Sequence, residues 1–284
     1  MRTAIRIIVA AAAAAAVLAG SATVRAGGGP PSIAWSPSTS GAFDFGSVAV
    51  GHDATQEFTL SNSGGSASAA LTVTLSGPEA FTITEDNCTG TSLGPRKSCT
   101  VTVQYAPTAA GDSAPATLEA TGKKEAADAP LTLTGRGVLR FSADLSPLSE
   151  NPPHPESHGT GTIVVVWDTV TSLMTVDITF SDLTTPNVAA HIHCCVAPPG
   201  NTGVATTVPT FTGFPGGVTS GTYSHTFDMF QASSYNPAFI ASHGGTAATG
   251  AAALLAGLQA GQAYQNIHTQ MFPGGEIRGF LQPS

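Results

Sequence analysis

Residues 189–195 have the sequence AAHIHCC, which predicts the β-strand around which the C-terminal half of the chain is organised. Successive side chains of a strand point to opposite faces of a sheet. His191 and His193 should therefore project side by side from one face, while Ile192 projects from the other. Residues 266–269 (NIHT) place His268 in a second predicted strand. We expect the first two histidines to share a face of a β-sheet, with a third available from a distant strand.

The composition predicts an all-β protein. Charged residues make up only 10% of the 284 residues, whereas the chain has 32 Gly and 20 Pro. Such a mixture favours short strands joined by turns, since long amphipathic helices need Glu, Lys, Arg and Leu on their faces. At roughly 150 residues per domain, the length indicates two domains.

The charge distribution argues against a nucleic-acid partner. The formal net charge is −8 with 10 Lys plus Arg, and no basic run lies beyond the N-terminus. A phosphate backbone would therefore find no positively charged surface to bind.

The N-terminus has the pattern of a signal peptide. Arg2 and Arg6 flank the start of an apolar run at residues 7–20, and Val24-Arg25-Ala26 offers a cleavage site, so residues 1–26 are predicted to be removed. A membrane anchor is the alternative, but the run is shorter than the ~20 residues that span a bilayer. No later stretch is long and apolar enough to span. We expect an exported protein, secreted, periplasmic or at the cell surface, whose cysteines can oxidise.

Residues 27–138 are expected to form an immunoglobulin-like β-sandwich. Apolar and polar residues alternate in runs such as 99–105 (CTVTVQY), as half-buried sandwich strands require. The predicted strands lie at residues 43–46, 55–62, 69–76, 80–84, 98–105, 116–121 and 131–135. About seven strands in ~100 residues are typical of the immunoglobulin-like fold.

Several motifs of this domain resemble the Hydin-like, or choice-of-anchor, β-sandwich modules of bacterial surface and secreted proteins. They are FDFGSV at residues 43–48, LSNSG at 60–64, SCTVTV at 98–103 and YAPT at 105–108. The resemblance implies a disulfide between Cys88 and Cys99, with two free buried thiols as the alternative. Closing so short a loop stabilises a fold by ~2–3 kcal/mol. Nothing in the domain predicts catalysis, so we interpret it as a spacer or interaction module.

Residues 139–284 are expected to form a second β-sandwich with a short helical insertion. Strands are predicted at residues 139–145, 158–167, 173–181, 188–194, 221–227, 263–269 and 276–281. Residues 236–243 and 246–260 are rich in Ala, with apolar residues at a helical spacing, so one or two short helices are expected there.

This half of the chain resembles a chordin-type (CHRD) domain. The motifs that carry the resemblance are ENPP at residues 150–153, GTG at 159–161, AHIH at 190–193, GLQAG at 257–261, AYQNIHT at 263–269 and FPGGEIRG at 272–279. The continuation HCC at 193–195, with GVATT at 203–207, resembles a bacterial exported subgroup. The resemblance implies the sandwich fold, whereas the family has no firmly assigned activity.

The histidines give the clearest chemical hypothesis. Neutral imidazole is a good ligand for copper or zinc, and a rigid sheet can offer three such nitrogens, here from His191, His193 and His268. The spacing also resembles the His-x-His strand of copper/zinc superoxide dismutase. That enzyme's bridging histidine and the ligands of its second metal have no counterpart here, so dismutase chemistry is not supported. The alternative is that the histidines are structural, with ring nitrogens bonded to backbone carbonyls, Glu276 or Asn266.

Three residues are predicted to contact and orient the ligands without binding the metal themselves: Glu276, Arg278 and Asn266. Glu276 would accept a hydrogen bond from an imidazole and orient it, as metal-bound histidines usually require. Arg278 would pair with Glu276 in a surface ion pair or attract an anion. Whether these side chains face His268 depends on the register of the hairpin through Pro273, because a slip by one residue reverses the face.

The adjacent cysteines leave two interpretations open. Cys195 has the same parity as the two strand histidines, so it is a possible thiolate ligand that would complete a set of histidines and one cysteine. Alternatively, Cys194 and Cys195 form a disulfide with each other, or one of them bonds elsewhere. A local disulfide would leave a three-histidine set.

Together these patterns predict an exported, non-catalytic binding protein whose second domain binds copper or zinc. The alternative is a structural or adhesive protein that contacts an unknown protein or polysaccharide at the cell surface. Its exposed aromatic patch would have to come from Trp167, Phe211, Phe214 and Tyr223. Catalytic serine elbows, phosphate-binding glycine loops and His-Glu-x-x-His helices do not occur in the sequence, so few catalytic alternatives remain. A redox enzyme is a distant third hypothesis.

Overall fold

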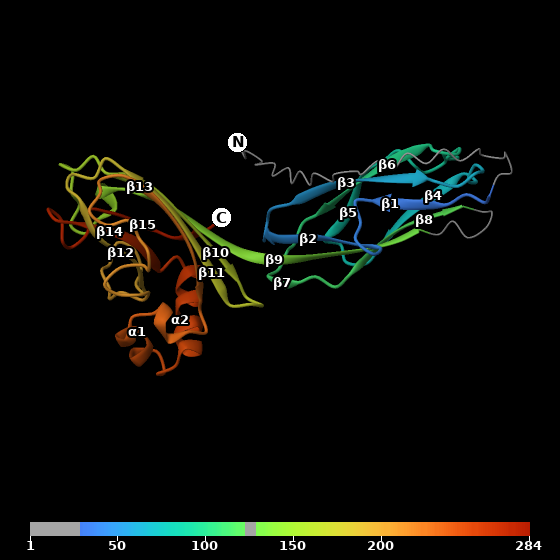
Figure 1. Ribbon diagram of the computed structural model, residues 1–284. Helices are drawn as coiled ribbons and strands as arrows, with labels where there is room; N and C mark the ends of the chain where they lie inside the picture. The colour runs from blue at the N-terminus through green and yellow to red at the C-terminus, as the bar shows by residue number, and fades with distance from the viewer. Residues whose placement is uncertain (1–28, 123–128) are drawn as a thin grey trace. The chain divides into compact units, whose positions relative to one another are not determined.

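The computed structural model describes residues 29–122 and 129–284, and it shows the predicted, nearly all-β chain with two β-sandwiches (Figure 1). The predicted signal peptide, residues 1–26, lies outside the described residues. The chain divides into two compact units, one up to Gly137 and the other from Val138. Strand β9 (Ala129–Leu145) begins in the first unit and ends in the second.

The first unit packs two antiparallel sheets face to face. One sheet has the order β1-β3-β6-β5, and the other joins β4 and β8 to the first part of β9, which also pairs with β2 and β7. These strands are β1 (Ile33–Ser36), β2 (Ala42–Ala49), β3 (Ala54–Asn62), β4 (Leu71–Ser76), β5 (Phe81–Asp86), β6 (Ser98–Tyr105), β7 (Gly111–Asp112) and β8 (Ala116–Gly122). Alternation along β6 turns Val101, Val103 and Tyr105 inward, where they share one core with Phe58 and Leu118.

A disulfide joins the loop after β5 to strand β6 in this unit. It links Cys88 to Cys99 with a Cα–Cα distance of 5.2 Å, which is the pairing that the sequence resemblance implies. Cys88 is fully buried, so the bridge fastens its loop to the core.

The second unit is a sandwich of a four-stranded and a three-stranded sheet. The four-stranded sheet has the order β13-β11-β10-β9 and uses the second part of β9, which also pairs with β16, whereas the three-stranded sheet has the order β12-β14-β15. The strands are β10 (Thr160–Asp168), β11 (Leu173–Ser181), β12 (Asn187–Cys194), β13 (Gly221–Asp228), β14 (Ala263–Thr269), β15 (Ile277–Phe280) and β16 (Gln282–Pro283). Short 3-10 turns lie at η1 (Pro147–Ser149) and η2 (Ala232–Ser234).

The core between these two sheets determines where the strand histidines go. Val165 and Val176 from the four-stranded sheet pack in one cluster with Ile192 and Ile267 from the three-stranded sheet. Because side chains alternate along β12, burial of Ile192 in the core sends its two histidine neighbours to the outer face of the three-stranded sheet.

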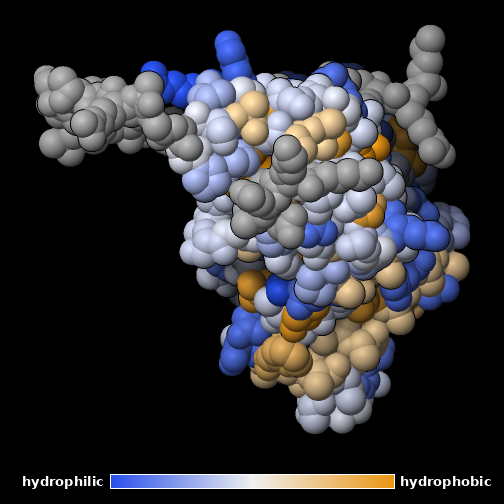
Figure 2. All heavy atoms as spheres, turned by 90° about the vertical axis from the view of Figure 1, so that its right-hand side faces the viewer, coloured by the Kyte–Doolittle hydropathy of each residue, from blue (hydrophilic) through white to orange (hydrophobic). Residues whose placement is uncertain are grey.

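The predicted helical insertion consists of α1 (Pro237–Ser242) and α2 (Ala247–Gln259). The side chains and backbone N–H groups of Thr246 and Thr249 form a reciprocal capping box that begins α2. Leu254 and Leu258 bury the inner face of this helix in the core. Its outer face is rich in alanine, and the part of the second unit that carries α1 and α2 in Figure 1 shows many apolar residues in Figure 2. Within the described residues, no helix is long and apolar enough to cross a membrane.

The aromatic residues expected to form an adhesive surface patch lie in the core instead. Trp167, Phe211, Phe214 and Tyr223 are 2%, 0%, 9% and 7% exposed. Trp167 continues the inward-facing series of β10, and Tyr223 lies on the inward face of β13, so strand alternation buries both side chains. The predicted exposed patch is therefore wrong for these residues.

Candidate metal centre

Strand register brings the three histidines together on the outer face of the three-stranded sheet. In the pairing of β12 with β14, His191 is opposite Asn266, His193 is opposite Tyr264, and Ala189 is opposite His268. Residues opposite each other in an antiparallel pair share a face, so all three imidazoles project from the same side. His191 and His193 are only 6% and 8% exposed, and His268 is half-buried.

The imidazoles converge closely enough to ligate one ion. Each histidine offers one ring nitrogen, and the three nitrogens lie within 4.8 Å of one another. Nδ1 of His191, Nε2 of His193 and Nε2 of His268 are buried and have no hydrogen-bond partner among the described residues. Buried polar atoms are nearly always paired, so three unpaired nitrogens at one place indicate a missing partner.

Two of the histidines have their tautomers fixed by the backbone. Nδ1 of His193 lies 2.8 Å from the carbonyl oxygen of Thr202, and Nδ1 of His268 lies 2.9 Å from that of Pro273. A carbonyl oxygen only accepts, so each Nδ1 must carry the proton and donate it. In the neutral rings, both Nε2 atoms are then left with a free lone pair, which is the form that binds a metal.

Burial keeps these rings neutral. It lowers the pKa of His191 to about 3, with further lowering by the neighbouring His268 and His193. Burial likewise lowers the pKa of His193 to about 4, although the bond to Thr202 opposes the shift. The pKa of His268 is also lowered by burial. At neutral pH the site therefore presents three neutral nitrogen donors.

Arg278 has a different environment from the one predicted. It is 1% exposed rather than on the surface, and its carboxylate neighbour is Glu150, with Arg278 Nε 3.8 Å from Glu150 Oε2, not Glu276. The guanidinium donates to the carbonyl of Ser149 and to groups of the loop that follows β12. These loop acceptors are Pro199 O at 2.9 Å, Asn201 Oδ1 at 2.7 Å and Gly200 O at 3.4 Å. Arg278 thus fastens two loops over the outer face of the sheet.

Glu276 does not orient an imidazole. Its carboxylate accepts hydrogen bonds from the Ser157 hydroxyl at 2.7 Å, the Thr184 N–H at 2.6 Å and the Thr269 hydroxyl at 2.7 Å. Glu276 precedes β15, so strand alternation does not force it to the face of Arg278. The role predicted for this carboxylate is taken by the backbone carbonyls of Thr202 and Pro273.

Asn266 does lie on the histidine face, next to a carboxylate that sequence reasoning missed. It is 2% exposed, and its Nδ2 donates to Oε2 of Glu150 at 3.5 Å. Glu150 is 6% exposed, and burial raises its pKa to about 7, although the Arg278 charge opposes the shift. The only sequence signal for Glu150 was its place at the start of the ENPP motif at residues 150–153.

Tyr264 supports His193 from its other side. The two rings stack with centroids 4.7 Å apart and an interplanar angle of 4°. The Thr202 N–H donates to the Tyr264 hydroxyl at 3.3 Å, so the same loop residue contacts both rings. The Arg278 guanidinium lies over the Tyr264 ring, 4.9 Å from its centroid.

Cys195 is not a thiolate ligand in this structure. It forms a disulfide with Cys194, the second of the two interpretations that the sequence left open. The pair packs against α2 at Gly257, where a Cβ atom would lie 2.8 Å from the Cys195 sulfur and still closer to that of Cys194. The candidate ligand set therefore consists of the three histidines.

This donor set fits a copper or zinc ion. Three neutral imidazoles are borderline ligands suited to these metals, and three protein ligands leave at least one coordination position open. Two of the three rings have the hydrogen-bonded second nitrogen that metal-bound histidines usually show.

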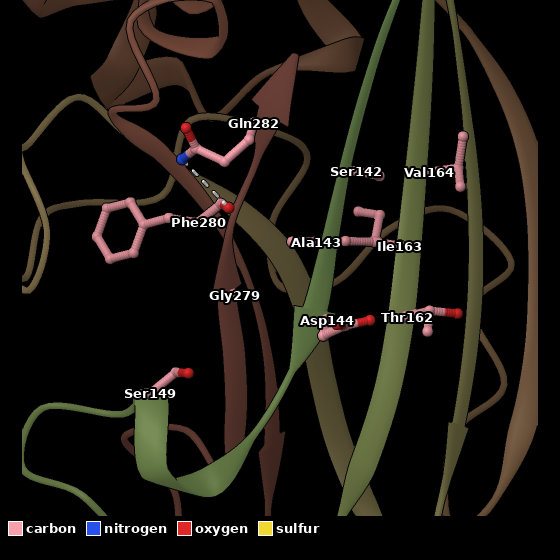
Figure 3. A pocket seen from close by; sticks show the side chains of 10 residues that line it. All are labelled: Ser142, Ala143, Asp144, Ser149, Thr162, Ile163, Val164, Gly279, Phe280 and Gln282. Atoms are coloured by element: carbon pink, nitrogen blue, oxygen red, sulfur yellow. Dashed lines mark hydrogen bonds between the residues drawn. The ribbon is translucent and has the colours of Figure 1, made fainter. Parts of the chain in front are cut away.

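A separate groove of about 630 Å³ lies between β9, β10 and β15 in the second unit (Figure 3). Small polar side chains and backbone line it, including Ser142, Asp144, Thr162 and Gln282, and none of the three histidines does. Phe280 at its wall packs against Tyr264, with ring centroids 5.0 Å apart. Phe280 thus links the wall of the groove to the Tyr264 ring that stacks on His193.

Comparison with known proteins identifies the second unit. A family model described as CHRD domain matches residues 141–281, so the chain contains a CHRD domain. A model described as Cep192 domain 4 matches residues 37–138, the immunoglobulin-like sandwich of the first unit. No curated protein matches the chain.

One solved structure with partial similarity is that of the Vibrio cholerae VesB protease. The similarity has 20% sequence identity and a TM-score of 0.29, and it covers 37% of this chain. The chain spans 31% of the length of that protein.

Proposed function

We propose that the CHRD domain of this chain binds one copper or zinc ion through His191, His193 and His268. Two observations carry the proposal: the three histidines offer ring nitrogens within 4.8 Å of one another, and one buried nitrogen of each ring has no hydrogen-bond partner among the described residues. Leaving a buried polar atom unpaired costs roughly 1–3 kcal/mol of folding free energy, so three unpaired atoms side by side would destabilise the fold. A metal ion would satisfy all three at once.

The structural alternative leaves one buried nitrogen of each ring unexplained. Bonds to the carbonyls of Thr202 and Pro273 account for one nitrogen of His193 and one of His268. They leave the opposite nitrogens of these rings, and Nδ1 of His191, without partners in the part of the chain that the structure describes. An adhesive role finds no support in the aromatic residues named for it, since they are buried. The metal hypothesis accounts for both nitrogens of His193 and His268.

We infer in addition that the protein is exported and binds the metal without catalysing a reaction. The N-terminal sequence pattern supports export, and so do two disulfides, which persist in oxidising compartments. The resemblance of the first unit to Hydin-like surface modules, and that of the second to a bacterial exported subgroup, point the same way. We expect its partner at the cell surface to be a protein or a polysaccharide.

Calorimetric titration with Cu(II) and Zn(II) tests the proposal. The chain from Gly27 onward, with its disulfides intact, is compared with the double variant His191→Ala/His193→Ala and with His158→Ala, which removes an exposed histidine of the same unit. We expect one ion per chain for the parent and for His158→Ala, and no saturable binding for the double variant. Cooperative unfolding of each variant shows that it is folded.

Two outcomes would overturn the proposal. One is the lack of saturable binding of either metal to the folded parent protein. The other is equal affinity in the parent and the double variant, which would place the bound ion elsewhere.

A further inference from the structure

The outer face of the three-stranded sheet carries two more buried atoms without partners. Oδ1 of Asn266 and Oε1 of Glu150 have no hydrogen-bond partner among the described residues, in side chains only 2% and 6% exposed. Together with the three histidine nitrogens, they make up five of the six unpaired buried side-chain atoms of the described residues, the sixth being Oε1 of Gln265. A bare metal ion would satisfy three of them and leave these two oxygens unexplained.

Asn266 adjoins two of the proposed ligands. It is the register partner of His191 across the sheet, and it precedes His268 by two residues on the same face of β14. Its side chain is therefore next to both imidazoles. Because its Nδ2 donates to Glu150 Oε2, the amide links this carboxylate to the histidine face.

The two unpaired oxygens lie near each other. A Cβ atom built on Gly275 would be 2.5 Å from Asn266 Oδ1 and 2.7 Å from Glu150 Oε1, so both oxygens border the same point and lie at most 5.2 Å apart. Two acceptors at this separation are within reach of one small molecule that donates two hydrogen bonds. Because Gly275 has no side chain, both oxygens can approach its backbone this closely.

Protein donors nearby are already engaged. Arg278, whose Nε is 3.8 Å from the other oxygen of Glu150, directs its N–H groups to loop acceptors at Ser149, Pro199 and Asn201. The Asn266 amide nitrogen, which has two N–H hydrogens, donates to Glu150 Oε2 and cannot reach its own Oδ1. Two acceptors cannot satisfy each other, so the partner has to bring its own hydrogens.

We infer that the metal keeps an exchangeable coordination position whose occupant, a small hydrogen-bond donor such as water, is held by Asn266 Oδ1 and Glu150 Oε1. The inference rests on the proposed function and extends it: the site would be open to an external ligand, unlike a closed structural metal site. The competing arrangement is a protonated Glu150 that donates to Asn266 by itself, without any ligand. The experiment separates the two.

Pulsed electron paramagnetic resonance of the Cu(II)-loaded chain in D₂O detects the occupant directly. A water on the metal gives a strongly coupled exchangeable deuterium signal, and we expect azide to abolish it by taking the position. Azide affinity at pH 8 then probes the role of the pair. We expect Glu150→Gln, which removes a negative charge beside the position, to raise azide affinity at least fivefold.

Two further variants make the test specific. Asn266→Asp adds a negative charge beside the same position and should lower azide affinity at least fivefold, so the inference can be tested even if Glu150→Gln does not fold. Asp144→Asn removes an exposed carboxylate from the neighbouring groove and should leave azide affinity unchanged.

Each failure has a distinct signature. Stoichiometric Cu(II) binding without an exchangeable deuterium signal would overturn this inference and leave the metal site standing. A second outcome would also overturn this inference and leave the metal site standing. In that outcome the deuterium signal is present, but azide affinity is the same in Glu150→Gln, Asn266→Asp and Asp144→Asn. The arrangement in which protonated Glu150 donates to Asn266 predicts this result. A folded parent chain that binds no Cu(II) or Zn(II) would overturn this inference together with the proposed function.

Discussion

His193 and Thr202 are joined by a hydrogen bond of 2.8 Å, from ring Nδ1 to a backbone carbonyl, and this bond decides which nitrogen of the ring is free. The carbonyl belongs to the loop after β12, and Arg278 holds that loop through Pro199 and Asn201. A buried arginine thus positions a proposed metal ligand through the loop between them. The relationship makes loop anchoring part of the proposed site.

Replacing Arg278 by Met should therefore weaken both stability and metal binding. The substitution removes the bonds to the loop acceptors, of which Pro199 O keeps a donor in Asn151 Nδ2, and it leaves Glu150 without its cation. The free energy of unfolding should therefore fall by about 3–5 kcal/mol. With His193 less well oriented, metal affinity should fall by roughly 10- to 100-fold, as for other residues behind metal ligands. Urea unfolding and calorimetric titration measure the two effects.

The control for this prediction is Arg140→Met, which removes a less buried arginine that bonds Ser284. It should change unfolding by no more than ~0.5 kcal/mol. If Arg278→Met bound metal as tightly as Arg140→Met, the loop anchor would play no part in the site.

Helix α2 gives a second prediction, because Gly257 lies against the Cys194–Cys195 disulfide. In Gly257→Ala the new methyl group would overlap both sulfur atoms, so the free energy of unfolding should fall by about 1–3 kcal/mol. Gly250→Ala is the matched control in the same helix, since its Cβ would meet Ile240 and Tyr235 at an ordinary 3.6 Å. There alanine should stabilise by ~0.5–1 kcal/mol. Equal effects of the two substitutions in non-reducing denaturation curves would contradict the packing argument.

Glu276→Gln tests the buried carboxylate that sequence reasoning assigned to the metal site. Burial by itself raises the pKa of Glu276, but hydrogen bonds from Thr184, Ser157 and Thr269 outweigh it and lower the pKa below the usual 4.5. A lowered folded-state pKa contributes stability above the unfolded-state pKa, and this contribution is lost as pH falls through the folded-state value. The free energy of unfolding of the variant should be about 1–3 kcal/mol lower at pH 7, because the new amide N–H2 group would face hydrogen-bond donors instead of accepting from them.

The deficit of Glu276→Gln should shrink below about pH 4.5, where the parent carboxylate also takes up protons. Urea unfolding at pH 7 and at pH 3.5 gives the comparison. Asp177→Asn, at an exposed position of β11, is the control and should show little change at either pH. A deficit that stays constant with pH would mean that the charge of Glu276 does not matter.

Sequence patterns predicted most of the strands and helices because the local residue preferences of this chain agree with the elements that it forms. The alternating runs of β10, β11 and β14 and the alanine-rich helices were predicted close to their observed bounds. The parity of His191 and His193 followed from the period of a strand alone. What local patterns could not provide was the pairing of β12 with β14, which puts His268 beside them.

The supporting residues were harder to predict because their partners come from distant loops. Arg278 looks like a surface residue until the loops at 147–150 and 199–201 are folded over it. Glu276 and Arg278 would share a face in a regular strand, but β15 starts only at Ile277. Glu150 lies in no regular strand, so no periodicity indicated its direction.

In the first unit, Asn62 offers a test that is independent of the metal. Its buried side chain accepts from the N–H groups of Ser32 and Gly64 at 3.0 and 2.9 Å, and it donates to the carbonyls of Ser66 and Leu93, both at 2.8 Å. Asn62→Ala removes all four bonds, and only the Leu93 carbonyl keeps another donor, the Ser68 N–H, so the substitution should cost about 2–4 kcal/mol. Thermal unfolding measures the loss, and a change smaller than that of the exposed control Ser61→Ala would contradict it.

Gly275 links the turn that holds His268 to the Asn266–Glu150 pair, and it cannot be replaced without moving one of them. Its φ of 128° is strained for any other residue, and a Cβ atom would lie 2.5 Å from Asn266 Oδ1. Gly275→Ala should therefore lower the free energy of unfolding by about 1–3 kcal/mol and metal affinity at least fivefold. Gly274→Ala, with nothing within 4 Å of its Cβ, should bind metal like the parent. If calorimetry gave both variants the same metal affinity, Gly275 would be required only for the conformation of the turn and not for the proposed site.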